Sequence, residues 1–198
     1  MKEQEVILVG AGGHALSITE FALPYIKGYL AHDISPLMQA KRLGDDDDLD
    51  LFLKDFLFHI AFVYSGAPDM TARRKLIEKY ERKGARFATF IAPSAIITPN
   101  AVVEEGASVM TGAIVNRAVI SSHAVVNSGA IVEHDCLIGK NSFIGPGAVI
   151  GGFTRIGQNC FIGLGARIKN GVNISDNVSI AMGSIITRDI LEPGLHFR

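Results

Sequence analysis

A strict period of six governs the second half of the chain. From Ile120 to Ile186 every sixth residue is valine or isoleucine, and a compact side chain stands four positions after each. This period fits neither an α-helix nor an alternating strand. It is typical of a parallel β-helix, in which each hexapeptide forms one side of a triangular coil. The aliphatic positions are Ile120, Val126, Val132, Ile138, Ile144, Ile150, Ile156, Ile162, Ile168, Ile174, Ile180 and Ile186.

The repeat begins earlier, near Ile91, and slips by one residue before Ile120, so we expect an irregular turn over residues 116–119. Cys136 and Cys160 both stand at the compact position of the repeat. We interpret them as buried filler side chains of a protein kept in a reducing compartment.

The first half alternates predicted strands and helices. Strands are expected at residues 5–10, around Tyr29, at 60–64 and at 86–90. Helices are expected at 15–27, bent or ended by Pro24, and at 71–83. This order predicts a mixed fold, with a small Rossmann-like α/β domain over residues 1–90 followed by a left-handed parallel β-helix over 91–198.

Composition excludes several functional classes. The 198 residues are 48% hydrophobic and carry a net charge of −1, which argues against a general nucleic-acid binder or a polybasic membrane anchor. The start, MKEQEVILVG, lacks the plan of a signal peptide, and no apolar run approaches the roughly 20 residues of a membrane span. We therefore expect a cytoplasmic protein.

A glycine-rich turn follows the first predicted strand. Gly10-Ala11-Gly12-Gly13-His14-Ala15 matches a variant of the dinucleotide-binding fingerprint, between a strand and a helix. The backbone amides of Gly12, Gly13 and His14 would face a diphosphate at the helix N-terminus. The alternative is a glycine turn that serves only close packing.

Glu133-His134-Asp135 interrupts the usual composition of the coils. An imidazole beside a carboxylate can act as a general base, because the carboxylate fixes its tautomer and raises its basicity. The alternative is a solvated polar trio on a turn. Cys136 is adjacent but occupies a filler position, so we expect direct transfer rather than a covalent acyl-enzyme.

Four segments together carry a family resemblance: VGAGGHA, ARFATFIAPSAIITPNA, VVNSGAIVEHDCLIG and the hexapeptide repeats. The chain resembles the bacterial hexapeptide-repeat sugar acyltransferases, of the sialic-acid O-acetyltransferase-like and bacillosamine-pathway N-acetyltransferase type. The resemblance implies a homotrimer that uses acetyl-CoA to acetylate a nucleotide-linked amino sugar. It also implies that His134 is the base and that Asp135 supports it.

The resemblance further implies two binding sites. Gly12, Gly13, His14 and Gly66 would contact the nucleotide sugar, with Asp33 as the carboxylate after the second strand. The coenzyme would lie against Gly152, Leu164, Lys169 and Met182, and Arg188 is a further phosphate candidate.

This chain departs from the family pattern at three places. Ala31-His32-Asp33 replaces the usual pair of acidic residues, and Phe143 stands where relatives often have a histidine near the acyl-CoA. The C-terminal segment, EPGLHFR, replaces the usual closing segment. Each change alters a predicted contact with the nucleotide or the coenzyme.

The leading hypothesis is acetyl transfer to the nitrogen of a UDP-4-amino-4,6-dideoxy sugar by direct attack. Alternatives are O-acetylation of a sugar hydroxyl or of sialic acid, and a non-catalytic scaffold that binds a nucleotide sugar. A metalloenzyme of the carbonic-anhydrase type needs three histidine ligands, and the central coils supply only His123 and His134. No metal is therefore expected.

Overall fold

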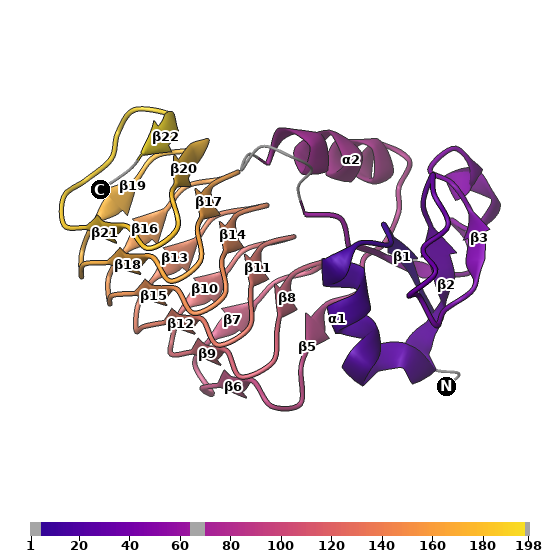
Figure 1. The fold of residues 1–198 in the computed structure, drawn as a ribbon, viewed down its shortest axis with the longest axis horizontal. Coiled ribbons are helices and arrows are strands. Elements are labelled where there is room, and N and C mark those ends of the chain that lie inside the picture. Colours follow the sequence, from indigo (N-terminus) through magenta and orange to yellow (C-terminus); the bar gives the residue numbers. More distant parts are fainter. Residues whose placement is uncertain (1–4, 64–69, 197–198) are drawn as a thin grey trace.

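The structure, a computed structural model, describes residues 5–63 and 70–196. In the N-terminal part a four-stranded parallel sheet has the order β3-β2-β1-β4 (Figure 1). The strands are β1 (Val6–Val9), β2 (Ile26–Leu30), β3 (Arg42–Gly44) and β4 (Leu57–Ile60). The helical elements are α1 (Gly13–Ala22), α2 (Thr71–Arg82) and the short 3-10 helices η1 (Leu23–Tyr25) and η2 (Asp48–Leu51).

This part agrees with the sequence prediction in type but not at every boundary. Helix α1 gives way to η1 at Leu23, because Pro24 stands in its first turn and cannot donate a helical hydrogen bond. Strand β4 begins three residues before the predicted position and ends at Ile60. The buried polar side chain of His59 hid this strand from a hydrophobicity pattern. No pattern in the sequence indicates β3.

The second part is a left-handed parallel β-helix of short strands arranged in three sheets (Figure 1). Sheet I contains β5 (Phe90–Ile91), β8 (Ser108–Val109), β11 (Val125–Val126), β14 (Phe143–Ile144), β17 (Phe161–Ile162), β20 (Val178–Ile180) and β22 (Gly194–His196). Sheet II contains β6 (Ile96–Ile97), β9 (Ile114–Val115), β12 (Ile131–Val132), β15 (Val149–Ile150), β18 (Arg167–Ile168) and β21 (Ile185–Ile186). Sheet III contains β7 (Val102–Val103), β10 (Val119–Ile120), β13 (Leu137–Ile138), β16 (Arg155–Ile156) and β19 (Asn173–Ile174).

The chain visits sheets I, II and III in turn, so the prism has three corners, named here I/II, II/III and III/I. Strands in register lie on successive coils, as in the pairing of Val126 with Ile144 and of Ile144 with Ile162. The aliphatic series points to the prism axis, where Ile138, Ile144 and Ile150 have no exposed surface. Burial there removes apolar surface from water along the whole series.

Two details of the repeat are confirmed. Cys136 and Cys160 are buried fillers, and burial raises the pKa of each thiol to about 11. Strands β9 and β10 are separated by one residue fewer than β12 and β13, and Arg117 in that short turn has a φ of 48°. The slip in the sequence is thus a shortened corner II/III.

The N-terminal part packs against sheet I and corner III/I. Arg73 of α2 is buried between the two halves, where it donates to the carbonyl oxygens of Phe62, His123 and Ile60 and to Asn141 Oδ1. At the other end, β22 of the C-terminal segment pairs with β20. No helix among the described residues is long and apolar enough to cross a membrane.

Candidate active site

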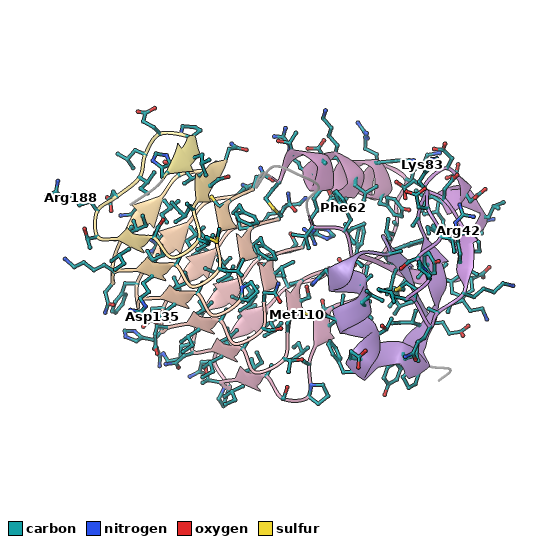
Figure 2. All side chains as sticks on the ribbon, in the orientation of Figure 1. Arg42, Phe62, Lys83, Met110, Asp135 and Arg188 are labelled. Carbon is teal, nitrogen blue, oxygen red and sulfur yellow. The ribbon has the colours of Figure 1, made fainter. Side chains whose placement is uncertain are left out.

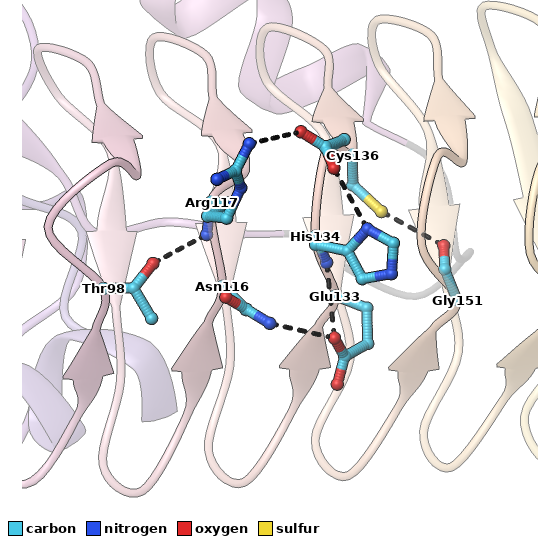
Figure 3. A network of polar contacts seen from close by, with 8 residues as sticks. Thr98, Asn116, Arg117, Glu133, His134, Cys136 and Gly151 are labelled. Atoms are coloured by element: carbon cyan, nitrogen blue, oxygen red, sulfur yellow. Dashed lines mark hydrogen bonds and ion pairs between the residues drawn. The ribbon is translucent and has the colours of Figure 1, made fainter.

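The histidine and aspartate of the EHD segment form a hydrogen-bonded pair at corner II/III. His134 Nδ1 lies 3.0 Å from Asp135 Oδ2 (Figure 3). Asp135 reaches its neighbour because its backbone is left-handed, with a φ of 59°. A carboxylate only accepts hydrogen bonds, so Nδ1 carries the proton and Nε2 has a free lone pair. Within the described residues, no hydrogen bond engages Nε2.

The coils on both sides leave room for the imidazole. A Cβ atom on Gly152 would lie 2.7 Å from Cε1 and Nε2 of His134, so only glycine fits beside the ring. On the other side lies the shortened turn, which lacks one residue at this corner. The ring of Phe153 contacts His134 edge to face, with the ring centroids 5.0 Å apart.

Polar groups of the preceding coil surround the pair (Figure 3). Arg117 Nη2 lies 3.5 Å from Asp135 Oδ1, and Asn116 donates to Glu133 at 3.1 Å. The hydrogen bond from His134, followed by the charge of Arg117, lowers the pKa of the Asp135 carboxyl. Asp135 therefore stays ionised and can stabilise the imidazolium that forms when His134 takes a proton.

The glycines of the N-terminal turn have different roles. Gly10 has a φ of 109°, and a Cβ there would lie 2.9 Å from the backbone nitrogen of Phe62, so packing requires this glycine. A Cβ on Gly12 or Gly13 would meet no described atom within 4 Å. Packing alone thus does not explain Gly12 and Gly13, which keep the N-terminus of α1 open to a ligand.

A cavity of about 430 Å³ lies between the turn and the prism. Its lining residues include the predicted ligands Gly12, Gly13, His14 and Leu164, together with Asn127, Phe143 and Pro146. His14 Nε2 lies 3.2 Å from Ser108 Oγ, and burial holds the pKa of His14 well below its usual range. The floor is apolar, because Phe143 stacks on Phe161 with centroids 5.1 Å apart.

A second cavity of about 400 Å³ adjoins the first at Gly12 and Phe62 and lies at the carboxyl ends of β1 and β2. Asp33 lines it, as predicted, together with Ala31 and His32. This edge of a parallel sheet is where α/β folds bind ligands. Gly66, the remaining predicted ligand of the nucleotide sugar, lies outside the described residues.

The predicted coenzyme residues occupy two different corners. Leu164 and Met182 lie on corner I/II, where Leu164 is 48% and Met182 77% exposed. Gly152 and Lys169 lie on corner II/III, with His134. Arg188 lines a separate cavity of about 490 Å³ at the C-terminal end of the prism. Figure 2 shows Asp135 at the edge of the prism, far from Phe62, which lines the cavity beside Gly12. One chain therefore does not bring the residues of corner II/III together with those of corner I/II.

Sequence reasoning missed several residues of these sites. Arg117 and Phe153 contact the His134–Asp135 pair, and Asn127 lines the first cavity. The slip in the repeat was a signal for Arg117, since it marked an irregular turn one coil before His134. Phe153 carried a weaker signal, as a large apolar residue at a corner of the prism.

Two family models match the coils of the prism. The bacterial transferase hexapeptide family (six repeats) matches residues 117–152, and the hexapeptide repeat of succinyl-transferase matches residues 153–188. A search of curated proteins found no match.

Solved structures match nearly the whole chain. The acetyltransferase domain of PglB from Neisseria gonorrhoeae, in complex with acetyl coenzyme A, is 27% identical with a TM-score of 0.88. That match covers 99% of this chain and 97% of the other. PerB from Caulobacter crescentus, in complex with CoA and GDP-perosamine, is 28% identical with a TM-score of 0.88, covering 98% of this chain and 94% of the other. WeeI from Acinetobacter baumannii, at 19% identity and a TM-score of 0.79, shares the fold over 97% of this chain and 95% of its own.

These matches extend over both halves of the chain, the α/β domain and the coils that carry His134. The chain therefore carries bacterial transferase hexapeptide repeats and is similar, over nearly its whole length, to acetyltransferases solved with acetyl coenzyme A or CoA.

Proposed function

We propose that this protein transfers the acetyl group of acetyl-CoA to the amino group of a nucleotide-linked sugar, of the UDP-4-amino-4,6-dideoxy type. The His134–Asp135 pair is the observation that carries the proposal. Its tautomer leaves the Nε2 lone pair free to accept a proton, and Gly152, which has no side chain, makes room for the ring. A general base with this geometry suits attack by an amine on a thioester.

The proposed reaction is a direct displacement. The sugar nitrogen bonds to the thioester carbonyl carbon, and the carbon–sulfur bond then breaks. The proton on nitrogen passes to Nε2 of His134 and then to the departing thiolate, which leaves as free CoA. Cys136 takes no part, because its thiol points to the Gly151 carbonyl oxygen at 3.1 Å and its pKa is raised to about 11.

The two cavities beside Gly12 support an activated sugar as the acceptor. The N-terminus of α1 attracts a diphosphate, and the Asp33 cavity can hold the nucleoside while the Phe143 cavity holds the sugar. Burial keeps His14 neutral, so it can hydrogen-bond a sugar without a charge. PerB, of similar structure, was solved with GDP-perosamine, an amino sugar of this class.

The coenzyme fits the exposed apolar stripe of corner I/II. Leu164 and Met182 stand on adjacent coils, because Gly183 donates to the Leu164 carbonyl oxygen at 2.8 Å. Both side chains are substantially exposed, unlike the aliphatic residues of the prism axis. Gly152 makes room for His134. Lys169 lies on corner II/III with the base, so it can reach only the phosphate of a coenzyme that is bound to a neighbouring chain.

This separation supports a homotrimer whose sites lie between chains. Sheet II joins corners I/II and II/III, and its outward row is largely apolar, with Ile96 57% and Ile185 59% exposed. If sheet II faces a threefold axis, corner II/III of each copy meets corner I/II of the next. The base of one chain then meets the sugar and coenzyme sites of its neighbour.

The first experiment measures thiol release from acetyl-CoA with a panel of UDP- and GDP-linked 4-amino-4,6-dideoxy sugars. We expect turnover with an amino sugar and a loss of at least about a hundredfold in His134→Ala. His196→Ala, a histidine at the far end of the prism, is the matched control and should keep full activity. Turnover that survives in His134→Ala would contradict the assignment of the base.

Mixed trimers test the shared site. Gly13→Leu should fill the sugar cavity without disturbing the fold, since its Cβ meets nothing within 4 Å. His134→Ala and Gly13→Leu should each be inactive alone. After mixing under conditions that exchange subunits, about a quarter of the sites combine an intact base with an intact turn. Recovery of about that activity is expected, and no recovery would place the complete site within one chain.

A further inference from the structure

The left-handed positions of the prism differ from corner to corner. Between residues 106 and 183 each turn has one residue with positive φ, a conformation that glycine adopts freely and asparagine tolerates, but that is uncommon for bulky side chains. Corner I/II has only glycine at these positions, and corner III/I has glycine, histidine and asparagine. Corner II/III instead has Arg117, Asp135, Phe153 and Gly171, with φ values of 48°, 59°, 61° and 73°.

The three unusual residues of corner II/III occupy consecutive coils around His134. Asp135 hydrogen-bonds His134 at 3.0 Å, Arg117 lies 3.5 Å from the other oxygen of Asp135, and Phe153 packs edge to face on the imidazole. The backbone stacks these residues directly, since Asp135 N donates to the Arg117 carbonyl oxygen and Phe153 N to that of His134. An unfavourable backbone position filled by a residue that contacts the base is a sign of function.

Burial does not hold the base in place. The side chain of His134 is 40% exposed and that of Asp135 is 37% exposed, while Phe153 is 61% exposed. Exposed side chains move among rotamers, and on the Gly152 side the ring meets a residue without a side chain, where an added Cβ would lie 2.7 Å from Cε1 and Nε2. Something other than core packing has to fix the plane of the ring and the direction of Asp135.

We propose that Arg117 and Phe153 are positioning residues that clamp the His134–Asp135 pair from opposite sides. Arg117 pairs with one carboxylate oxygen of Asp135, so the other oxygen stays directed at His134 Nδ1. Phe153 limits rotation of the imidazole, so Nε2 stays directed at the substrate. This inference rests on the proposed role of His134 as the base, and it adds two residues that act through that base.

Phe153→Asn separates positioning from stability. Asparagine suits the left-handed backbone, so the melting temperature should stay equal or rise, while kcat falls by about tenfold and KM stays unchanged. Phe153→Tyr keeps the ring and should restore kcat. Asn177→Phe, the reverse change at a left-handed position of corner III/I, should lower the melting temperature and leave kcat unchanged.

Arg117→Asn tests the other side of the clamp through the pH profile. His134, through its hydrogen bond, and Arg117, through its charge, are the groups that act on Asp135. Removing a positive charge near the imidazole favours its protonated form, so the acid limb of kcat/KM should move to higher pH. The plateau should fall by about two- to fivefold, the range for an exposed ion pair. Arg117→Lys keeps the charge and should keep the position of the limb.

Two results would overturn the proposal. A Phe153→Asn variant that loses trimer stability while keeping its kcat would make Phe153 an interface residue only. An Arg117→Asn variant with unchanged kcat and an unchanged acid limb would remove Arg117 from the clamp. Both outcomes are distinct from failure of the base assignment, which is decided by His134→Ala alone.

Discussion

The two halves of this chain reach burial by different chemistry. The prism axis is built mainly from valine, isoleucine, alanine and cysteine, with serine or threonine at a few compact positions such as Ser142 and Thr154. The N-terminal half and its junction with the prism instead bury Arg73 and His59 completely. Apolar burial is non-directional and repeats coil by coil, whereas a buried charge needs acceptors at fixed positions. The prism is therefore a uniform support, and polar contacts fix how the N-terminal half sits on it.

Arg73 shows this contrast most clearly. It has no exposed surface, and its described partners are three carbonyl oxygens and an amide oxygen rather than a carboxylate. Burial lowers the pKa of its guanidinium to about 9. Because its partners lie in both halves, Arg73 links the position of the turn at Gly12 to the corners of the prism.

The largest predicted effect comes from removing this link. Arg73→Ala leaves buried acceptors without a donor and a cavity between the halves, so it should lower the free energy of unfolding by about 4 kcal/mol. Arg74→Ala is the control, since Arg74 faces Glu78 at 3.9 Å on the surface, and it should cost less than about 0.5 kcal/mol. Urea denaturation measures both. Similar small losses in the two variants would refute the distinction between the halves.

A change on the prism axis should cost somewhat less. Ile150→Ala removes buried methyl groups next to the coil of His134 and should lower the free energy of unfolding by about 3 kcal/mol. Val102→Ala, at an outward position that is 50% exposed, should cost under about 1 kcal/mol. Urea melts of the two variants make the test, and equal costs would contradict the assignment of the axis as the main apolar core.

As the pH falls, the junction between the two halves should lose stability at a higher pH than the prism does. Burial, first among the causes, lowers the pKa of His59 to about 4 and that of His123 to about 3. An unfolded histidine titrates near pH 6.5, so their stabilising effect is complete above that pH and is lost as the pH falls toward those lower values.

The predicted loss between pH 6 and pH 5 is about 2 kcal/mol for these two groups, and His14, whose pKa is also lowered by burial, adds a loss of the same sign. His59→Asn keeps an amide donor for the Ala88 carbonyl oxygen but cannot titrate, so it should remove about 1 kcal/mol of the loss. Urea denaturation at the two pH values provides the measurement. A pH-independent free energy of unfolding in the unmodified protein would show that these histidines bind protons equally in the folded and unfolded states, and would contradict the lowered pKa values.

The smallest effect is expected at Cys136. Serine at this position can donate to the Gly151 carbonyl oxygen, as Ser142 donates to Gly157 at 2.7 Å on a neighbouring corner. Cys136→Ser should therefore cost under about 1 kcal/mol and leave kcat within about twofold. Loss of turnover without loss of stability would instead favour a covalent acyl-enzyme and contradict direct attack.

The sequence predicted the prism well and the N-terminal half less well. A period of six specifies the strands, the axis residues and the short turn at Arg117, because every coil repeats the same local geometry. Strand β3 and the start of β4 were missed, because their burial depends on partners distant in the chain. His59 is a polar residue inside a strand, and only the tertiary structure supplies its acceptor, the Ala88 carbonyl oxygen.

The candidate site shows the same division. The sequence alone shows the segment EHD, the turn GAGGHA and the repeat that places EHD on a β-helix. These features depend on residue type and local spacing. The tertiary structure decided that Asp135 reaches His134, that Arg117 and Phe153 flank the pair, and that His134 and the cavity beside Gly12 lie on different corners. Those facts depend on the coil-to-coil stacking of residues about 18 positions apart and on how the two halves pack, which no local pattern encodes.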